Sequence, residues 1–234
     1  MDGLVLPEGP VQVIEIGPGT GVLTQYLMTR PQVALTLFEI DRESVAYLKE
    51  QFPSLASKIV EGDFLQMDLE KVVPGDFHII GNFPYNISSQ IFFKVLEHRQ
   101  QAKQIVCMLQ KEVADRIAEK EGSKTYGILS VLLQAYFHID YLFKVPPGVF
   151  FPPPKVMSAV IRLTRNNRVT LGCDEALFKK VVKQAFQNRR KTLRNALKPL
   201  NLKATILALP LMDKRAEQLS VEQFISLTQL IEQG

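Results

Sequence analysis

Residues 11–21, VQVIEIGPGTG, form a short apolar run that ends in three closely spaced glycines. The β-branched run is typical of a buried strand, and the glycines permit a tight turn with close backbone approach by a ligand at the start of a helix. Their spacing is G-x-G-x-G, whereas a turn that binds the pyrophosphate of a dinucleotide has the spacing G-x-G-x-x-G. The stretch therefore predicts a strand, a ligand loop and a helix in succession, and it disfavours a nicotinamide cofactor.

The same strand-then-helix order recurs through the first two thirds of the chain. Such alternation is typical of a mostly parallel, doubly wound α/β sheet, whose ligands bind beyond the carboxyl ends of the strands. The last two strand-like segments have no helix between them, which predicts an antiparallel pair at the sheet edge. The expected strands cover residues 11–17, 33–40, 58–64, 76–82, 104–110, 138–145 and 155–164.

The polar stretch 165–175 is the expected boundary between a domain of residues 1–165 and a small all-helical domain of residues 166–234. Residues 179–198 are expected to form one basic helix, since nine basic residues and no Asp or Glu lie between Lys179 and Lys203. A solvated helix face usually mixes both signs of charge. This stretch therefore points to a nucleic-acid partner more strongly than the net charge of +4 does.

Composition excludes several other classes of protein. The two cysteines, Cys107 and Cys173, form no CxxC pair or Cys/His cluster, so neither a structural disulfide nor a metal site is expected. The apolar runs are too short to span a bilayer, and the N-terminus lacks a signal pattern. A cytoplasmic protein without a membrane partner is expected.

Acidic residues follow the second and third expected strands. Glu39 could accept hydrogen bonds from both hydroxyls of a ribose, and Asp63 could accept one from an adenine amino group flanked by Phe64. Each acid alone could be an ordinary solvated side chain. Together with the glycine loop they lie at one edge of the predicted sheet, which favours a nucleoside site. An adenosine ligand without a phosphate loop suggests S-adenosylmethionine.

The fourth expected strand ends in GNFPYNIS, residues 81–88. Asn82 and Pro84 would suit a simple turn. Beside an adenosine cofactor, however, the Asn82 amide oxygen and the Phe83 carbonyl could orient an adenine amine for methylation, and Tyr85 could stack on the base. Because Pro84 restricts Phe83 to extended conformations, it would aim that carbonyl at the amine nitrogen.

The segments VIEIGPGTGVLT, FEID, EGDFLQ, NFPYNISSQIFFKVL and FFPPPKVMSAVIRL resemble the ribosomal RNA adenine N6-dimethyltransferases. More narrowly, they resemble the small-subunit (16S) members, which dimethylate two adjacent adenosines near the 3′ end of that RNA during ribosome biogenesis. The resemblance implies a Rossmann-like, seven-stranded methyltransferase sheet with a small helical RNA-binding domain. It implies that the catalytic residues are Asn82, Phe83, Pro84, Tyr85 and Phe150, with Phe151 in place of Phe150 if the alignment shifts by one.

The resemblance also implies the cofactor and RNA contacts. S-adenosylmethionine would be bound by Glu15, Gly17, Gly19, Gly21, Glu39, Asp63, Phe64 and Asn82. In the basic stretch, Arg189, Arg190, Lys191 and Arg194 would contact phosphate in ribosomal RNA of an immature 30S subunit. The expected protein is a monomer.

One departure from the family pattern concerns the N-terminus. Members begin with a segment that helps to cover the cofactor, whereas here only MDGLVLPEGP precedes the first strand. A docking factor for ribosome assembly with little or no catalysis is therefore an alternative. A second alternative is a large-subunit (23S) adenine methyltransferase that confers antibiotic resistance. A DNA adenine methyltransferase is disfavoured because the chain has no room for a DNA-target domain.

Overall fold

The computed structural model describes residues 3–233 and divides into two compact units. The first unit contains the chain up to Ala114 and residues His138–Arg165, and the second contains Asp115–Phe137 and the chain from Asn166 onward. The expected boundary between residues 165 and 166 is one of the division points. Segment 115–137, which the sequence assigns to the first domain, belongs to the second unit instead.

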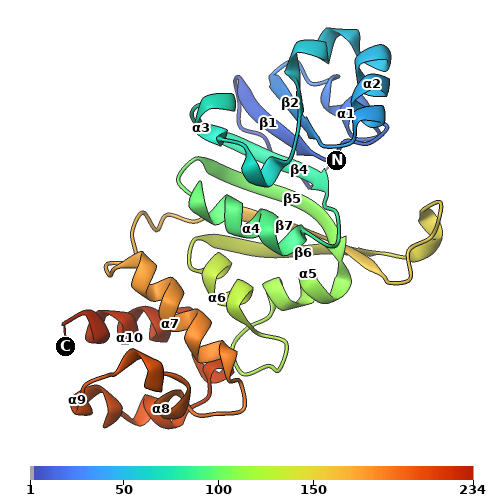
Figure 1. Ribbon diagram of the computed structural model, residues 1–234. Helices are drawn as coiled ribbons and strands as arrows, with labels where there is room; N and C mark the ends of the chain where they lie inside the picture. The colour runs from blue at the N-terminus through green and yellow to red at the C-terminus, as the bar shows by residue number, and fades with distance from the viewer. Residues whose placement is uncertain (1–2, 234) are drawn as a thin grey trace. The chain divides into compact units, whose positions relative to one another are not determined.

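The first unit is built on a seven-stranded sheet (Figure 1). The expected strands are all present, and the sheet has the mixed α/β fold of a doubly wound protein. β1 to β5 are parallel to one another, whereas β7 runs antiparallel to β5. In spatial order the strands are β3 (Ile59–Glu61), β2 (Val33–Glu39), β1 (Val11–Ile16), β4 (Phe77–Asn82), β5 (Ala102–Gln110), β7 (Ser158–Arg165) and β6 (Phe137–Val145).

The two central strands form the apolar core of the sheet. Val13 and Ile14 of β1 and Ile79 of β4 are fully buried. Strands covered on both faces read as continuous apolar runs, as these do. Gly81 lets β4 approach β1 closely, because a Cβ atom there would lie 2.6 Å from the Ile16 carbonyl oxygen. This approach places the ends of β1 and β4 side by side.

Helices connect the strands of the first unit and form most of the second. Aspartate side chains begin three of them: the Asp41 carboxylate accepts from Ser44 N, the Asp68 carboxylate accepts from Lys71 N, and the Asp174 carboxylate accepts from Ala176 N and Leu177 N. The helices are α1 (Thr24–Leu27), α2 (Arg42–Gln51), α3 (Leu69–Val72), α4 (Ser88–Glu97), α5 (Lys111–Ala118), α6 (Ile128–Gln134), α7 (Glu175–Gln187), α8 (Leu193–Ala196), α9 (Ala204–Leu207) and α10 (Val221–Gln233). Short 3-10 helices are η1 (Pro53–Lys58), η2 (Phe64–Gln66), η3 (Pro147–Val149), η4 (Lys198–Leu200), η5 (Pro210–Asp213) and η6 (Ala216–Gln218).

The second unit explains where segment 115–137 lies. Helix α6 buries Leu129, Val131, Leu132 and Leu133, an apolar surface too large for one face. It satisfies this burial by packing against α7 and α10, which follow it by many residues in the chain. The segment therefore joins the C-terminal helices rather than the sheet.

The single basic helix expected over residues 179–198 is wrong. Helix α7 ends at Gln187, where Asn188 leaves helical conformation with φ −124°. A turn closed by Lys191 N donating to Asn188 O follows, and Thr192 pairs with Arg215 in an isolated β-bridge before α8 begins. The basic residues thus lie on a helix, a turn and a second short helix.

Candidate active site

A cavity of about 650 Å³ opens where β1, β4 and β5 end. Cavities of roughly 300–1,000 Å³ are typical of small-molecule sites. Its wall comes from the loop after β1, the ends of β4 and β5, strand β6 and the segment between β6 and β7, which extends beyond the sheet (Figure 1). Among the residues that line it are Glu15, Gly17, Gly19, Asn82, Phe150 and Phe151.

The glycine loop has the backbone that its sequence predicts. Gly17, Gly19 and Gly21 all have positive φ, at 64°, 55° and 79°. Residues with a Cβ rarely adopt this conformation. At Gly21 there is also no space, since a Cβ atom would lie 2.4 Å from the Phe52 ring. A Cβ atom at Gly17 would lie 3.9 Å from the Asn82 carbonyl oxygen, so the cofactor loop and the target-amine motif are neighbours.

Glu15 lies beneath this loop as a buried carboxyl group. Its side chain is 1% exposed, and Thr24 Oγ1 donates to Glu15 Oε2 at 2.8 Å. Burial raises the pKa of Glu15 to about 7, an effect that the hydrogen bond from Thr24 partly offsets. The cavity therefore contains a carboxyl group that titrates near neutral pH, which suits a ligand carrying positive charge.

Glu39, the last residue of β2, holds the glycine loop in place. Its Oε2 accepts from Gly19 N at 3.1 Å, and its Oε1 accepts from Ile40 N at 2.9 Å and Asp41 N at 3.0 Å. A carboxylate offers about four acceptor positions. Backbone N–H groups occupy three of these positions, so about one acceptor position is left for a ribose hydroxyl. Hydrogen bonds to both ribose hydroxyls would therefore displace one of the three backbone donors.

Asp63 follows β3 and begins η2, where its Oδ1 accepts from Leu65 N at 2.9 Å. It is joined to the Glu39 region, because Gly62 N donates to Glu39 O at 2.8 Å. Phe64, the first residue of η2, packs into the core of the unit. Its ring is buried edge-on against Phe38, with centroids 5.3 Å apart, so it anchors the loop that carries Asp63.

The target-amine motif lies at the end of β4. Asn82 is exposed and lines the cavity. Phe83 is 1% exposed, its N donates to Met108 O at 2.9 Å, and its ring meets Phe92 edge-on. The Phe83 side chain therefore anchors the turn, and the contribution that it can make to a substrate is through its carbonyl. Pro84 is exposed, and Tyr85 is half-buried.

The aromatic pair of the segment between β6 and β7 reaches the same cavity. Phe150 is half-buried, whereas Phe151 is fully exposed. Phe150 N donates to Pro147 O at 3.1 Å, which closes η3. Both residues line the cavity, so either ring is available to a base that enters beside Asn82.

These residues fit S-adenosylmethionine. The buried Glu15 suits its positive charge, the glycine loop admits a ligand close to the backbone, and Glu39 and Asp63 follow the neighbouring strands as acceptors for an adenosine. Glu39 and Asp63 do not line the 650 Å³ cavity itself. Within residues 3–233, no group of three or more His, Cys, Asp or Glu side chains is placed to hold a metal ion.

The chain matches the family described as ribosomal RNA adenine dimethylase over residues 7–233. It belongs to this family. The dimethylase match covers the glycine loop, the target-amine motif and the basic turn together, so both units of the structure are part of it.

Two curated relatives show how closely the chain follows other members of the dimethylase family. The chain is 57% identical to a protein of Cytophaga hutchinsonii named ribosomal RNA small subunit methyltransferase A, with 99% of this chain and 90% of the relative covered. It is 60% identical to a protein of the same name from Parabacteroides distasonis, with 92% and 81% covered.

Solved structures show the dimethylase fold. A dimethyladenosine transferase from Plasmodium falciparum has a TM-score of 0.74 at 24% identity, with 92% of this chain and 88% of that chain covered. The 23S rRNA methyltransferase ErmE has a TM-score of 0.68 at 25% identity, with 94% and 91% covered.

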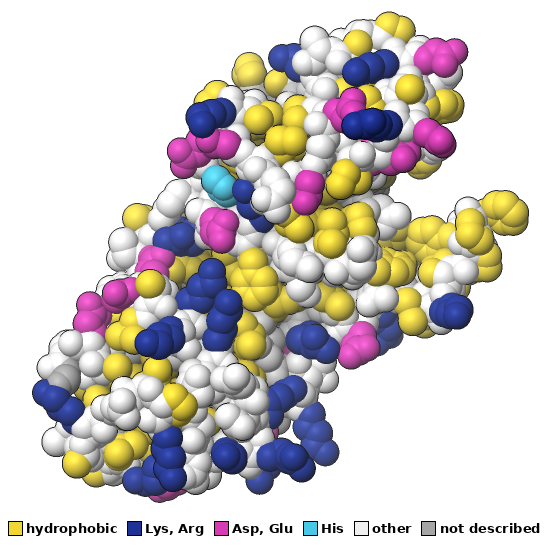
Figure 2. All heavy atoms as spheres, in the orientation of Figure 1, with side chains coloured by type: hydrophobic (Ala, Val, Ile, Leu, Met, Phe, Trp, Pro, Cys, Tyr) yellow, Lys and Arg dark blue, Asp and Glu magenta, His cyan; other side chains and the backbone are white. Residues whose placement is uncertain are grey.

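The expected RNA contacts lie in the second unit, where Lys and Arg side chains gather at the surface (Figure 2). A cavity of about 280 Å³ at the turn after α7 is lined by Gln187, Asn188, Arg189, Arg190 and Lys191. Arg190 and Lys191 are exposed, and neither side chain has a hydrogen-bond or ion-pair partner among residues 3–233.

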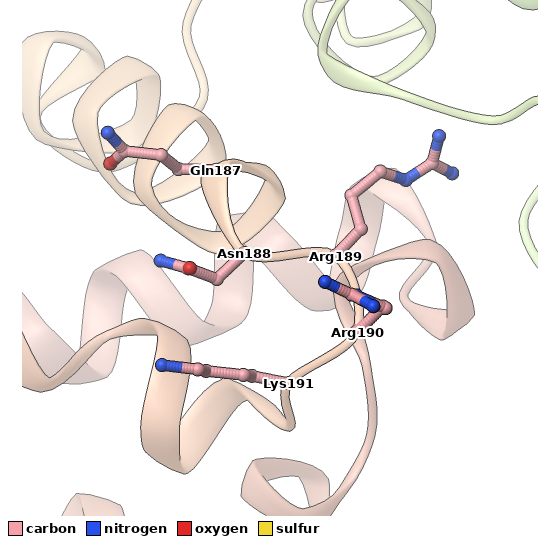
Figure 3. A pocket seen from close by; sticks show the side chains of 5 residues that line it. All are labelled: Gln187, Asn188, Arg189, Arg190 and Lys191. Carbon is pink, nitrogen blue, oxygen red and sulfur yellow. The ribbon is translucent and has the colours of Figure 1, made fainter.

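Two of the four expected phosphate contacts, Arg189 and Arg194, also bond to protein groups. Arg189 points away from the other side chains of the turn (Figure 3) and donates through Nη2 to Lys124 O at 2.7 Å and Tyr126 O at 2.8 Å. Arg194 bonds to Asp213 Oδ1 and donates to Leu207 O. Sequence reasoning missed these roles because their partners lie far along the chain.

Proposed function

We propose that the chain transfers methyl groups from S-adenosylmethionine to the N6 amine of two adjacent adenosines near the 3′ end of small-subunit (16S) ribosomal RNA. The observation that carries this proposal is that Asn82 lines the same cavity as Glu15 and the glycine loop. The family match supports adenine dimethylation, and the relatives named ribosomal RNA small subunit methyltransferase A support the choice of RNA.

The cofactor, when bound, supplies an electrophilic methyl group on a positively charged sulfur. Glu15 would stabilise that charge within the cavity, and its proton would be released as the positive ligand enters. The glycine loop and Glu39 would hold the ribose side, and Asp63 would accept from the adenine amino group. This chain's residues thus select an adenosine that carries positive charge.

The target adenine has an amine whose lone pair is delocalised into its ring. The Asn82 side-chain oxygen and the Phe83 carbonyl would each accept one of its N–H groups, which orients the nitrogen and favours a more pyramidal geometry. The methyl group would pass to this nitrogen as its bond to the cofactor sulfur breaks, and the displaced amine proton would pass to solvent. Much of the rate enhancement would come from holding the reacting atoms in line.

The second unit would position the ribosomal RNA. Arg190 and Lys191 are the proposed phosphate contacts, which set affinity and register rather than sequence choice. We extend the proposal to immature 30S subunits as the substrate, to a monomeric enzyme and to a cytoplasmic location. Within residues 3–233, no helix has the length and apolar character needed to cross a membrane.

A methylation assay on small subunits that lack the two dimethyladenosines tests the proposal. Asn82→Ala is expected to lower kcat about 100-fold or more, since removing one preorganised group at a reacting centre has effects of roughly that size. S-adenosylmethionine affinity, measured by calorimetry, should fall much less than kcat does, because Asn82 is only one of eight residues expected to contact the cofactor. The matched control is Asn86→Ala, an exposed asparagine on the same turn that does not line the cavity.

Two other results would contradict the proposal. Methyl transfer to large-subunit RNA alone would favour the activity suggested by the likeness to ErmE. Binding of small subunits without any methyl transfer or cofactor binding would identify the chain as a docking factor for ribosome assembly.

A further inference from the structure

Tyr85, in the target-amine motif, is held at both ends by buried serine hydroxyls. Its own hydroxyl shares a hydrogen bond of 2.5 Å with Ser158 Oγ, and its backbone carbonyl accepts from Ser88 Oγ at 3.3 Å. Ser158 is 0% exposed and Ser88 is 1% exposed, whereas Tyr85 itself is half-buried. The backbone of Tyr85 and the hydroxyl at the far end of its ring are thus both bonded to buried groups, while part of the residue remains accessible.

Ser158 stands where two parts of the site meet. It is the first residue of β7, pairs with Gln110 at the end of β5 and directly follows the segment that contains Phe150. The position is fixed by Lys111 N, which donates to Met157 O at 2.9 Å. The Tyr85–Ser158 bond therefore joins the target-amine turn to the base of the aromatic segment, across 73 positions of sequence.

We propose that Ser158 is a positioning residue that holds the Tyr85 ring at the angle needed to stack on the target adenine. The inference rests on the proposed function, because it assigns Tyr85 to the substrate base. Through the same bond, the turn that presents Asn82 and the segment that presents Phe150 keep a fixed spacing. A base held between them has one orientation in which its amine meets both acceptors.

Loss of the bond would leave the tyrosine in place but free to rotate about its side-chain torsions. A hydrogen bond of this kind contributes about 0.5–1.5 kcal/mol, which corresponds to a rate effect of up to about tenfold if it acts only through orientation. Small misplacements of positioning groups also lower rates without weakening ground-state binding. The expected effect is therefore on kcat rather than on cofactor affinity.

A double-mutant cycle separates this positioning role from a purely structural one. Ser158→Ala and Tyr85→Phe remove the same hydrogen bond from opposite ends, and Tyr85→Phe keeps the stacking ring. We expect each to lower kcat by about fivefold to tenfold, and the double variant to fall no further. The KM for S-adenosylmethionine should stay within about twofold in all three.

The control for loss of a buried hydroxyl is Thr228→Val. Thr228 is 0% exposed, donates to Phe224 O at 2.8 Å within α10 and lies in the other unit. It should lower stability without changing kcat. Unchanged kcat in Ser158→Ala, or effects of the two single changes that multiply in the double variant, would overturn the proposal.

A second measurement does not depend on activity. The chain has six tyrosines, so labelling with 3-fluorotyrosine gives a small set of fluorine resonances, of which Tyr85→Phe identifies one. Ser158→Ala should shift or broaden that resonance and leave the others unchanged. If the wild-type chain transfers no methyl groups, the proposed function fails while this spectrum still decides whether Ser158 positions Tyr85. An unchanged Tyr85 resonance would refute the positioning role.

Discussion

The Glu15 carboxyl group links the chemistry of the cavity to the stability of the fold. Burial raises its pKa from 4.5 to about 7, so the folded chain binds this proton more tightly than the unfolded chain does. The contribution of this bound proton to the free energy of unfolding is complete below about pH 4.5, and it is lost as the pH rises through 7. A neutral side chain of the same shape should avoid that loss.

Glu15→Gln is accordingly expected to gain stability relative to the parent as the pH rises. The gain should be on the order of 3 kcal/mol between pH 5 and pH 8, since one pKa unit corresponds to about 1.4 kcal/mol. Urea unfolding at several pH values measures it, with the exposed Glu50→Gln as the matched control. A difference between Glu15→Gln and parent that does not change with pH would contradict the pKa assignment.

Single residues of the candidate site were predictable where the backbone itself imposes the residue type. The glycines of the loop have positive φ, and Asn82 ends a buried strand, so both are visible in local sequence. Thr24 beneath Glu15 and Ser158 beside Tyr85 were missed because a hydroxyl partner is chosen by tertiary packing. The packing of Phe64 against Phe38 was missed for the same reason, since Phe38 lies on β2.

At the scale of elements, the apolar runs predicted the strands correctly, whereas the prediction of one basic helix over residues 179–198 was wrong. Residues 179–198 have continuous helical propensity, but the helix ends at Gln187, and Arg189 beyond it bonds to two carbonyl groups of segment 115–137. Its guanidinium also lies 5.8 Å from the centre of the Phe186 ring. Tertiary hydrogen bonds here override local propensity.

Substitution of the neighbouring Arg189 and Arg190 by alanine should therefore have different effects. Arg189→Ala is expected to lower the free energy of unfolding by about 1–3 kcal/mol, because charge-assisted bonds to two carbonyls are lost. Arg190→Ala should change stability by less than about 0.5 kcal/mol, yet weaken RNA binding and reduce its salt dependence. Chemical denaturation and RNA titrations at several salt concentrations measure both. Equal loss of stability in the two variants would refute the division of roles.

At the scale of the whole molecule, the sequence predicted two domains but placed only one of their boundaries. Composition changes clearly at residue 165, whereas nothing in the local pattern of segment 115–137 shows that its partners are C-terminal helices. Helix α6 reads like another sheet-covering helix until its contacts with α7 and α10 are known. Helix propensity and apolar spacing identify a helix, and they leave its neighbours open.

A chain that ends at Arg165 is expected to be defective within segment 115–137. The buried face of α6 would lose α7 and α10, which leaves Leu129, Val131 and Leu133 in water. Limited proteolysis with mass spectrometry should find cleavage between residues 115 and 137 in that shortened chain and not in the full chain. Replacing the segment by a flexible linker should remove the defect. Equal resistance of residues 115–137 to proteolysis in both chains would contradict the assignment of this segment to the second unit.

The interleaved order of the two units also bears on how such a protein can arise. The chain passes from one unit to the other after Ala114, after Phe137 and after Arg165. A single crossover in the gene cannot exchange the helical unit intact, because part of that unit is encoded within the sheet unit. Recombination between relatives would bring together an α6 and an α7 that never adapted to each other. Hybrids joined at residue 165 should therefore survive only where the two parents share the α6 surface.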